Sequence, residues 1–459
     1  MINLIYIYNL AEDAETLVAG MSDKAQKKVE IEEDLGLADH EFFLGKNNKI
    51  IISSNPVSGE FIGYVRSVTG HRQITNLSPK SENPNLCRAI SEDRKFFRNL
   101  VALVRSCEKP PKIISYATTP YFIELVNHLR KFNLKFITPD LGEPSSVWTR
   151  DYFGSKSGFR QFINLYFPHD RLVKMPEGFV ASNPAEAAKI AADIYLKNKG
   201  VVIKINRGHA GAGLKIFTPG SLPGNYEKIT KLLLKLFGRD SYWRREPVVV
   251  EKLVPVDWKI GGGSPNIELI VKPGGRVEKL YACGMRVTPE GVFKGVEAGR
   301  RALPFSLERK LEKIGFSIGK RYAKAGYRGS FEVDLVINKK GGLYCTESNL
   351  RKTGGTFVYD LGINLFGKGF LNSKFCLSHN LFFHDKLKKM DFARLYRVLA
   401  PVLYPIGEST EGLVISGVSL LKTGRFGYVI FADSKKRAYS IEAKMTKLLS
   451  TSFGLQPLK

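Results

Sequence analysis

Apolar and polar residues alternate between strand-like and helix-like spacing in the first 145 residues. Apolar runs at 49–54 and 112–117 are typical of buried strands, and the opening MINLIYIY predicts a first strand. Residues 93–105 carry apolar side chains at helical spacing, and a second helix is expected over about 120–132, before a short strand LKFIT. This alternation predicts a parallel sheet of Rossmann-like type. No GxGxxG fingerprint supports a dinucleotide site there.

Helices and hairpins are expected in the middle of the chain. Asn183, with Pro184 and Glu186 after it, predicts a capped helix that ends at Gly200. The remaining expected elements are strands at 201–205, 214–217 and 248–254 and a hairpin over 266–284. A glycine-rich loop, NRGHAGAG (206–213), separates the first two strands. Its backbone amides could wrap anionic oxygens, although an ordinary hairpin is an alternative.

The strongest amphipathic stripe spans residues 307–325, with Ser306 as the expected N-cap and Gly326 as the expected end. Beyond about 376 we expect a helical, basic linker. Strands at 412–421 and 426–434 and a closing helix then predict a small α/β unit.

The 307–325 helix leads into two strand-like runs, 330–338 and 343–349, joined by four turn-forming residues. If Lys340 and Gly341 form a two-residue turn, facing residues have numbers that sum to 681. The sequence therefore predicts a hairpin with a defined register.

In that register Asp334 lies directly opposite Glu347, and Glu332 lies opposite Asn349, all on one face. Directly opposed like charges destabilise a sheet. A hard divalent cation with oxygen ligands, most naturally Mg²⁺ carrying phosphates, would resolve the conflict. A solvated acidic face, or ion pairs with nearby lysines, are the alternatives.

Composition restricts the class of protein. The 459 residues suffice for two or three domains, and 43% hydrophobic residues suffice for real cores. No apolar run reaches the length of a membrane span, and the N-terminus does not have the pattern of a signal peptide. Five scattered cysteines without CxxC spacing favour a reducing compartment. We therefore expect a soluble, cytoplasmic protein that does not bind membranes.

The net charge of +26 favours anionic partners such as nucleotides, phosphorylated substrates or tRNA. The basic residues are spread along the chain, and no long basic tract with interleaved aromatics stands out. A general basic bias therefore explains the charge at least as well as nucleic-acid binding. The sequence leaves the oligomeric state open, including a homo-oligomer.

The stretch from about 150 to 360 resembles an ATP-grasp ligase domain. The likeness rests on the lysine of VVIKI before the glycine-rich loop, on VVVEKLVPVD, and on FEVDLVINKKGGLYCTESNLR with its D-x₁₂-E-x-N-x-R spacing. Lys156, forty-eight residues before Lys204, fits the family's earlier phosphate-binding lysine. The phrases SKSGFRQF, SPNIELIV and ESNLRKTGGT further resemble the pheganomycin-type peptide ligases.

This resemblance implies an α/β architecture with three parts. Residues 1–148 would form a Rossmann-like pre-ATP-grasp domain, 149–375 the ATP-grasp domain, and 376–459 a linker and small C-terminal domain. It also implies ATP and Mg²⁺ as cofactors, and small-molecule or peptide carboxylates and amines as substrates. The expected reaction joins the two through an acyl phosphate.

The resemblance also implies roles for particular residues. The metal ligands would be Asp334, Glu347 and Asn349. The nucleotide contacts would be Lys156, Lys204, His209, Gly211, Gly213, Glu251, Lys252, Val254 and Asp257. Among them, Glu251 would accept from the adenine amino group, Lys252 and Val254 would offer backbone contacts, and Asp257 would bond the ribose hydroxyls. Arg351, Arg286 and Arg300 would act on the substrate carboxylate or the transferring phosphoryl group. For each lysine or arginine the alternative is plain surface charge, and for His209 an incidental loop position.

Glu332 departs from the family pattern, in which a basic residue often stands two positions before the metal-binding Asp. It would serve either as an extra metal ligand or as a partner for a substrate amine. Two other functions remain alternatives at this point: an ATP-grasp small-molecule kinase, and a basic RNA-binding or regulatory protein with a vestigial ATP site.

Overall fold

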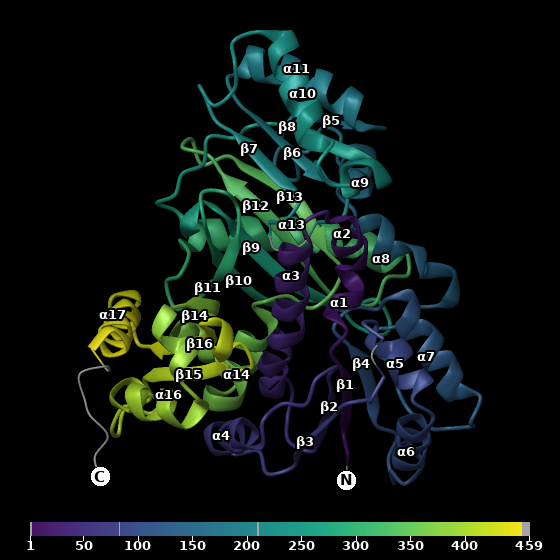
Figure 1. Ribbon diagram of the computed structural model, residues 1–459, viewed down its shortest axis with the longest axis vertical. Coiled ribbons are helices and arrows are strands. Elements are labelled where there is room, and N and C mark those ends of the chain that lie inside the picture. Colours follow the sequence, from purple (N-terminus) through teal and green to yellow (C-terminus); the bar gives the residue numbers. More distant parts are fainter. Residues whose placement is uncertain (1, 82, 209–210, 452–459) are drawn as a thin grey trace.

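The first sheet is parallel, as the strand–helix alternation predicts. The computed structural model describes residues 2–81, 83–208 and 211–451. Four strands lie in the order β3-β2-β1-β4, at the bottom of Figure 1. Their bounds are Leu4–Ile7 (β1), Lys49–Ile52 (β2), Ile74–Leu77 (β3) and Lys112–Ser115 (β4). The expected strand LKFIT forms only one parallel bridge, between Lys112 and Ile137.

Helices cover both faces of this sheet, because its strands are apolar on both sides. Their bounds are Leu10–Asp13 (α1), Glu15–Gly20 (α2), Lys24–Gly36 (α3), Gly59–Thr69 (α4), Leu86–Glu92 (α5), Arg94–Arg105 (α6) and Pro120–Arg130 (α7), with a 3-10 helix, η1, at Leu37–Phe43. The predicted helices α6 and α7 are confirmed. Asp93 caps α6 by accepting from Phe96 N at 2.9 Å, and Thr119 Oγ1 caps α7.

The second sheet, at the top of Figure 1, has the order β5-β8-β6-β7 and is antiparallel. Its strands are Gly178–Ala181 (β5), Val201–Ile205 (β6), Leu214–Phe217 (β7) and Val248–Lys252 (β8). The neighbouring helices are Trp148–Phe153 (α8), Lys156–Tyr166 (α9), Pro184–Asn198 (α10), Tyr226–Phe237 (α11) and Tyr242–Arg245 (α12). Asn183 Oδ1 caps α10 through Glu186 N at 2.9 Å, as predicted.

The third sheet is antiparallel and has eight strands in the order β13-β12-β9-β10-β11-β14-β16-β15. Its strands are Pro265–Val271 (β9), Val277–Val287 (β10), Phe293–Gly299 (β11), Gly329–Ile337 (β12), Leu343–Asn349 (β13), Phe375–Phe383 (β14), Gly412–Gly417 (β15) and Arg425–Ala432 (β16). Its helices are Phe305–Lys324 (α13), Thr356–Phe366 (α14), Phe370–Ser373 (α15), Phe392–Leu399 (α16) and Lys435–Thr451 (α17). No helix in the described ranges is long and apolar enough to cross a membrane.

Two sequence expectations in this region are wrong. Phe375–Phe383 is a strand paired with β11 and β16, whereas we expected a helical linker from about 376. Strands from the C-terminal segment therefore continue the same sheet. Helix α13 begins at Phe305 after Pro304 and has no side-chain cap bond, so Ser306 is not its N-cap. Gly326, with a φ of 92°, ends the helix as predicted.

The β12–β13 hairpin has the predicted register at the acidic residues but not the predicted turn. Asp334 pairs with Glu347, whereas Leu335 pairs with Cys345. The turn is closed by Asn338 and Gly342, so its loop has three residues instead of two. A bulge at Thr346 adds one residue on β13 and restores the register beyond it.

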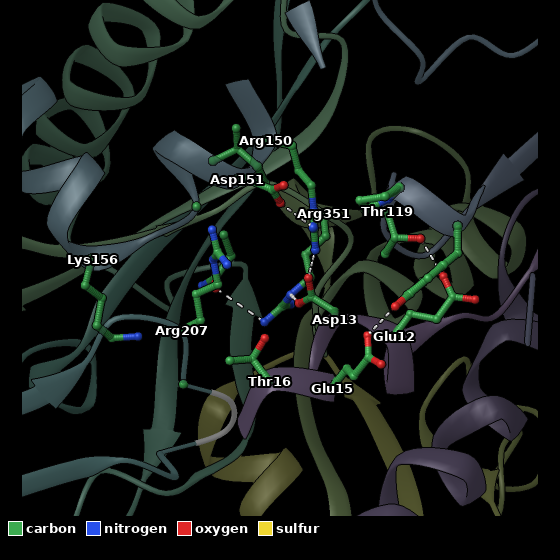
Figure 2. A pocket seen from close by; sticks show the side chains of 16 residues that line it. Glu12, Asp13, Glu15, Thr16, Thr119, Arg150, Asp151, Lys156, Arg207 and Arg351 are labelled. Atoms are coloured by element: carbon green, nitrogen blue, oxygen red, sulfur yellow. Dashed lines mark hydrogen bonds and ion pairs between the residues drawn. The ribbon is translucent and has the colours of Figure 1, made fainter. Parts of the chain in front are cut away.

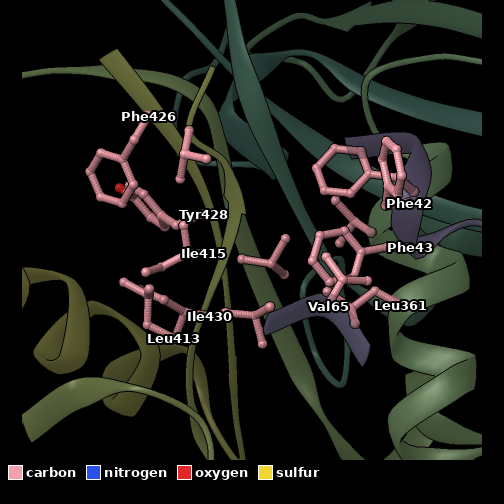
Figure 3. Packing of buried hydrophobic residues seen from close by; sticks show 14 of the residues in the cluster. Phe42, Phe43, Val65, Leu361, Leu413, Ile415, Phe426, Tyr428 and Ile430 are labelled. Atoms are coloured by element: carbon pink, nitrogen blue, oxygen red, sulfur yellow. The ribbon is translucent and has the colours of Figure 1, made fainter. Parts of the chain in front are cut away.

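The largest hydrophobic cluster joins the N-terminal and C-terminal segments. In Figure 3, Phe42, Phe43 and Val65 lie opposite Leu413 and Ile430 of β15 and β16. All of these side chains are fully buried. Burial of such side chains stabilises each by about 1.5–3 kcal/mol, so the two ends of the chain hold each other in place.

Inside this cluster His40 stacks on Phe357 with ring centroids 4.2 Å apart, and burial lowers the pKa of His40 from 6.5 to about 3. The unfolded chain therefore binds a proton more readily than the folded chain. Stability should fall as the pH decreases from about 6.5 toward about 3, by roughly 1.4 kcal/mol per pH unit for this group. We expect His40→Phe to flatten this dependence in urea unfolding at pH 5 and pH 7.5.

The matched control is His169→Phe, because His169 is exposed. It should keep the slope of the wild type. An unchanged slope in His40→Phe would contradict a neutral, buried His40.

Candidate functional site

Acidic and amide side chains form two rows across three neighbouring strands of the large sheet. The first row joins Asn266 of β9, Asp334 of β12 and Glu347 of β13. The second row, from the same strands, consists of Glu268, Glu332 and Asn349. Alternate residues of a strand share one face, so all six lie on the same side of the sheet. The predicted metal ligands are thus brought together.

Amide groups hold the carboxylates apart. Asn266 Nδ2 donates to Asp334 Oδ1 at 2.9 Å and also bonds Glu332. Asn349 Nδ2 donates to Asp334 Oδ2 at 3.0 Å. Burial, with Glu332 and Glu347 nearby, raises the pKa of Asp334 well above its usual value. Burial and Glu268 raise the pKa of Glu332 to about 8.

Glu347 differs because it has a cationic partner. Lys156 Nζ lies 2.7 Å from Glu347 Oε2. Burial alone would raise the pKa of Glu347, but Lys156 lowers it to about 2. Lys156 is the first residue of α9, and its backbone N–H donates to Asn206 O at 3.0 Å. This bond ties α9 to the start of the glycine-rich loop.

A second lysine is held by a buried ion-pair cluster. Lys204 Nζ lies 2.7 Å from Glu251 Oε2, and Arg160 Nη2 lies 2.5 Å from Glu251 Oε1. Lys204 Nζ also donates to Thr346 O at 3.2 Å, the carbonyl of the β13 bulge. Glu251 is therefore occupied by two cations, although the sequence analysis assigned it to the adenine amino group.

The residue set fits a hard cation. Asp334 and Glu347 supply two carboxylates, and Asn349, whose Oδ1 accepts from Arg351 Nη2 at 3.3 Å, could supply an amide oxygen; these are the ligand types that Mg²⁺ prefers. The electrostatic conflict around Asp334 would also be relieved by a cation. In the described ranges no group of three or more His, Cys, Asp and Glu side chains has a metal-binding arrangement. The predicted set contains only two such side chains.

A cavity of about 240 Å³ lies between these residues and the N-terminal helices. Figure 2 shows Asp13 of α1 between Arg150 of α8 and Arg351. Asp13 Oδ2 accepts from Arg351 Nε at 2.7 Å, and Asp13 Oδ1 pairs with Arg150. Lys156 and Arg207 line the same cavity. Acidic side chains line it as well, namely Glu12, Asp13, Glu15 and Asp151, so the cavity carries both charges. Its arginines and its lysine are the groups that can bind a carboxylate or a phosphate.

Asp13 and Arg150 were not predicted as site residues from the sequence. Only tertiary packing brings α1 and α8 to the end of β13, and no local spacing indicates that contact. The sequence signal that existed was the cluster TRDY at the start of the middle segment, which places Arg150 and Asp151 next to each other.

The structure does not bring Arg286 and Arg300 to the carboxylates. Arg286 Nη1 lies 2.8 Å from Glu442 Oε1 of α17 and donates to Ser378 O. Arg300 is exposed at the far end of β11. Alternate residues of a strand point to opposite faces of the sheet. Met285 and Val287 line a cavity together with Asp334 and Glu347, and Arg286, which lies between them in the strand, does not line it.

The other predicted nucleotide contacts follow β8 and the glycine-rich loop. Lys252 is exposed, and Val254 and Asp257 lie in the connection to β9, where Asp257 N donates to Ile337 O at 2.8 Å. Gly211 and Gly213 have φ angles of 92° and 76°, and a side chain at Gly211 would collide with Gly291 O. His209 lies outside the described residues.

Solved structures of two enzyme groups resemble nearly the whole chain. Biotin carboxylase from Campylobacter jejuni, in a β,γ-ATP complex, aligns at a TM-score of 0.57 and 14% identity, over 96% of this chain and 90% of that chain. The fold is the ATP-grasp fold. The biotin carboxylase domain dimer of the Hydrogenobacter thermophilus 2-oxoglutarate carboxylase, in complex with MgADP, ADP and bicarbonate, gives 0.57 and 13%, over 98% and 90%.

N5-carboxyaminoimidazole ribonucleotide synthetase from Thermus thermophilus gives a TM-score of 0.53 at 12% identity, over 99% of this chain and 100% of that chain. No family model and no curated protein matches the sequence. At such low identity the ATP-grasp likeness shows the fold alone.

Proposed function

We propose that this ATP-grasp chain is an ADP-forming, ATP-dependent carboxylate–amine ligase that requires Mg²⁺. The observation that carries the proposal is the pairing of Asp334 with Glu347, next to Asn349 and beside Lys156. The similar biotin carboxylases occur in complexes with ATP or MgADP. The acidic pair lies next to a cavity whose lining includes Arg150, Lys156, Arg207 and Arg351. Such cations beside a metal site suit anionic ligands held together by the metal.

Each residue has a defined task in this proposal. Asp334, Glu347 and Asn349 hold Mg²⁺, which, when bound, neutralises charge on the phosphates during transfer. Lys156 and Lys204 bind phosphate oxygens as point charges. When a phosphate binds, the ion pair between Lys156 and Glu347 would break and Lys156 would bind a phosphate oxygen instead. The ion pair between Lys204 and Glu251 would remain.

The remaining nucleotide contacts form around β8. Lys252 and Val254 offer backbone groups to the base, and Asp257 bonds the ribose hydroxyls. Gly211 and Gly213 allow the glycine-rich loop to approach the phosphates closely. Glu251 acts here mainly by holding Lys204 and Arg160.

The reaction has two steps. A carboxylate oxygen of the substrate attacks the γ-phosphorus of ATP, so that ADP leaves and an acyl phosphate forms. A free amine then attacks the acyl carbon, the C–O bond to the phosphate breaks, and an amide and inorganic phosphate result. Arg351, at the junction of β13 and the cavity, places its planar fork on the carboxylate or acyl phosphate. Exclusion of water by the glycine-rich loop protects this intermediate.

More specifically, we propose that the ligase forms a peptide bond. The phrases SPNIELIV and ESNLRKTGGT resemble pheganomycin-type ligases, and both contribute residues to the acidic rows: Asn266 and Glu268 from the first, Glu347 and Asn349 from the second. The substrates would then be amino acids or short peptides.

The test is a screen of amino acids and short peptides in pairs for ADP release. We expect release that requires both a carboxylate and an amine and that leaves no phosphorylated product. A stable phosphorylated substrate would indicate a kinase instead. ATP binding without any substrate-dependent turnover would contradict the ligase and favour a regulatory protein.

A further inference from the structure

A second cavity, of about 190 Å³, lies above the acidic rows and differs in chemistry from the first. Its walls are apolar and come from the N-terminal segment, from the ends of β10 and β11 and from α14: Leu10, Leu37, Met285, Val287, Phe293 and Phe357. Its floor carries Glu332, Asp334 and Glu347. The volume is below the roughly 300–1,000 Å³ of drug-sized ligand pockets, so it suits one group of amino-acid size.

Two residues that line this cavity have polar atoms without hydrogen-bond partners. Tyr8 Oη and Asn380 Oδ1 are both buried and have no hydrogen-bond partner among the residues that the structure describes. The orientation of the Asn380 amide is fixed, because its Nδ2 donates to Gly354 O at 2.9 Å. The unpaired atom of Asn380 is therefore its acceptor oxygen, Oδ1. Buried polar groups are normally paired. Asn380 Oδ1 can only accept and so fits an N–H donor of a ligand, and Tyr8 Oη can accept or donate beside it.

The charged residues that line the two cavities also favour an amine in the second cavity. The floor of the second cavity carries Glu332, an acid that is not among the proposed metal ligands. The first cavity is lined by basic side chains, Arg150, Lys156, Arg207 and Arg351, together with the acids Glu12, Asp13, Glu15 and Asp151. An amine beside Glu332 suits the second cavity, and the arginines of the first cavity can bind a carboxylate. The two cavities share Gly208, Asn349 and Arg351. Ligands in both would thus meet at the predicted place of acyl transfer.

We infer that the second cavity is the amine-substrate pocket and that it selects an amine on an apolar body of one amino-acid size. This inference rests on the proposed ligase function. The apolar walls hold the side chain, and Tyr8 and Asn380 accept from the nitrogen-bearing end. Glu332 then acts as a partner for the substrate amine, one of the two roles that the sequence leaves open.

The test uses amino-acid amides, which can serve only as amines because they have no carboxylate. Calorimetry with L-leucinamide, L-serinamide and glycinamide, with and without MgADP, measures the preference. We expect leucinamide to bind at least about tenfold more tightly than serinamide. Val287→Phe fills the cavity and should abolish this preference. Equal affinities in the wild type, or a preference that survives Val287→Phe, would overturn the inference.

Tyr8→Phe separates a binding role from a structural role. It removes an unpaired buried hydroxyl, so the melting temperature should stay the same or rise. Leucinamide affinity should nevertheless fall about threefold to tenfold. Tyr322→Phe is the matched control, since Tyr322 is fully buried but packs on Phe153 and Phe331. Unchanged leucinamide affinity in Tyr8→Phe would count against the pocket.

The two proposals fail in different ways. If leucinamide binds with the expected preference but no pair of substrates releases ADP, the ligase function is wrong and the pocket remains. If ADP release requires only small polar amines and leucinamide has no preference, the ligase remains and the pocket is wrong.

Discussion

Asp334→Asn should reduce substrate-dependent ADP release by about 1,000-fold or more. The change keeps the size of the side chain but removes one of two carboxylates that would hold Mg²⁺. A metal contributes several kcal/mol of transition-state stabilisation, and each 1.4 kcal/mol is tenfold in rate. Steady-state ADP release with a substrate pair from the screen measures the loss.

The stability of the Asp334→Asn variant should stay close to that of the wild type. Burial and neighbouring acids raise the pKa of Asp334, so a neutral side chain relieves charge repulsion. Its NH₂ group, however, faces an amide donor, Asn266 Nδ2 or Asn349 Nδ2, and we expect the two effects to offset each other and the melting temperature to change little. The matched control is Asp193→Asn on the exposed face of α10, where Asp193 pairs with Lys197 at 2.8 Å. It should keep full activity. ADP release by Asp334→Asn within tenfold of the wild type would reject the metal site.

Glu251→Leu should destabilise the protein by about 3–5 kcal/mol, the cost of leaving buried charges without a partner. Arg160 and Lys204 both bond Glu251, and all three side chains are at most 7% exposed. Urea unfolding at neutral pH measures the change. This loss should exceed the effect of breaking any exposed ion pair.

Glu278→Leu is the control, because Glu278 pairs with Arg276 at the protein surface. Surface pairs contribute less than about 1 kcal/mol. A loss below about 1 kcal/mol in Glu251→Leu, together with a raised KM for ATP, would show instead that Glu251 serves the adenine base. That result would restore the role that the sequence analysis assigned to it.

Local patterns predicted the elements that carry the site. The pairing of Asp334 with Glu347 is correct although the turn is not, because the bulge at Thr346 cancels the extra loop residue. The bulge itself could not be predicted, since no local spacing marks it; its carbonyl accepts from Lys204, which lies on a different sheet. Strand alternation along β10 would have excluded Arg286, whose neighbours point the opposite way.

Long-range packing was the part that the sequence could not supply. Nothing in the spacing of residues 376–459 indicates that β14 joins β11 to extend the same sheet. The contact of Asp13 with Arg351 likewise depends on how the N-terminal helices pack against the third sheet. The domain boundaries at 148 and 375 remain predictions.

The most direct test of the central proposal follows oxygen from the carboxylate to phosphate. A carboxylate substrate from the screen, labelled with ¹⁸O in both oxygens, is incubated with ATP, Mg²⁺ and the amine. Phosphorus NMR then detects ¹⁸O in the released phosphate. An acyl-phosphate ligase predicts one ¹⁸O atom in each phosphate, because the bond between the acyl carbon and the bridging oxygen breaks. Unlabelled phosphate, or a stable phosphorylated product, would contradict the proposal.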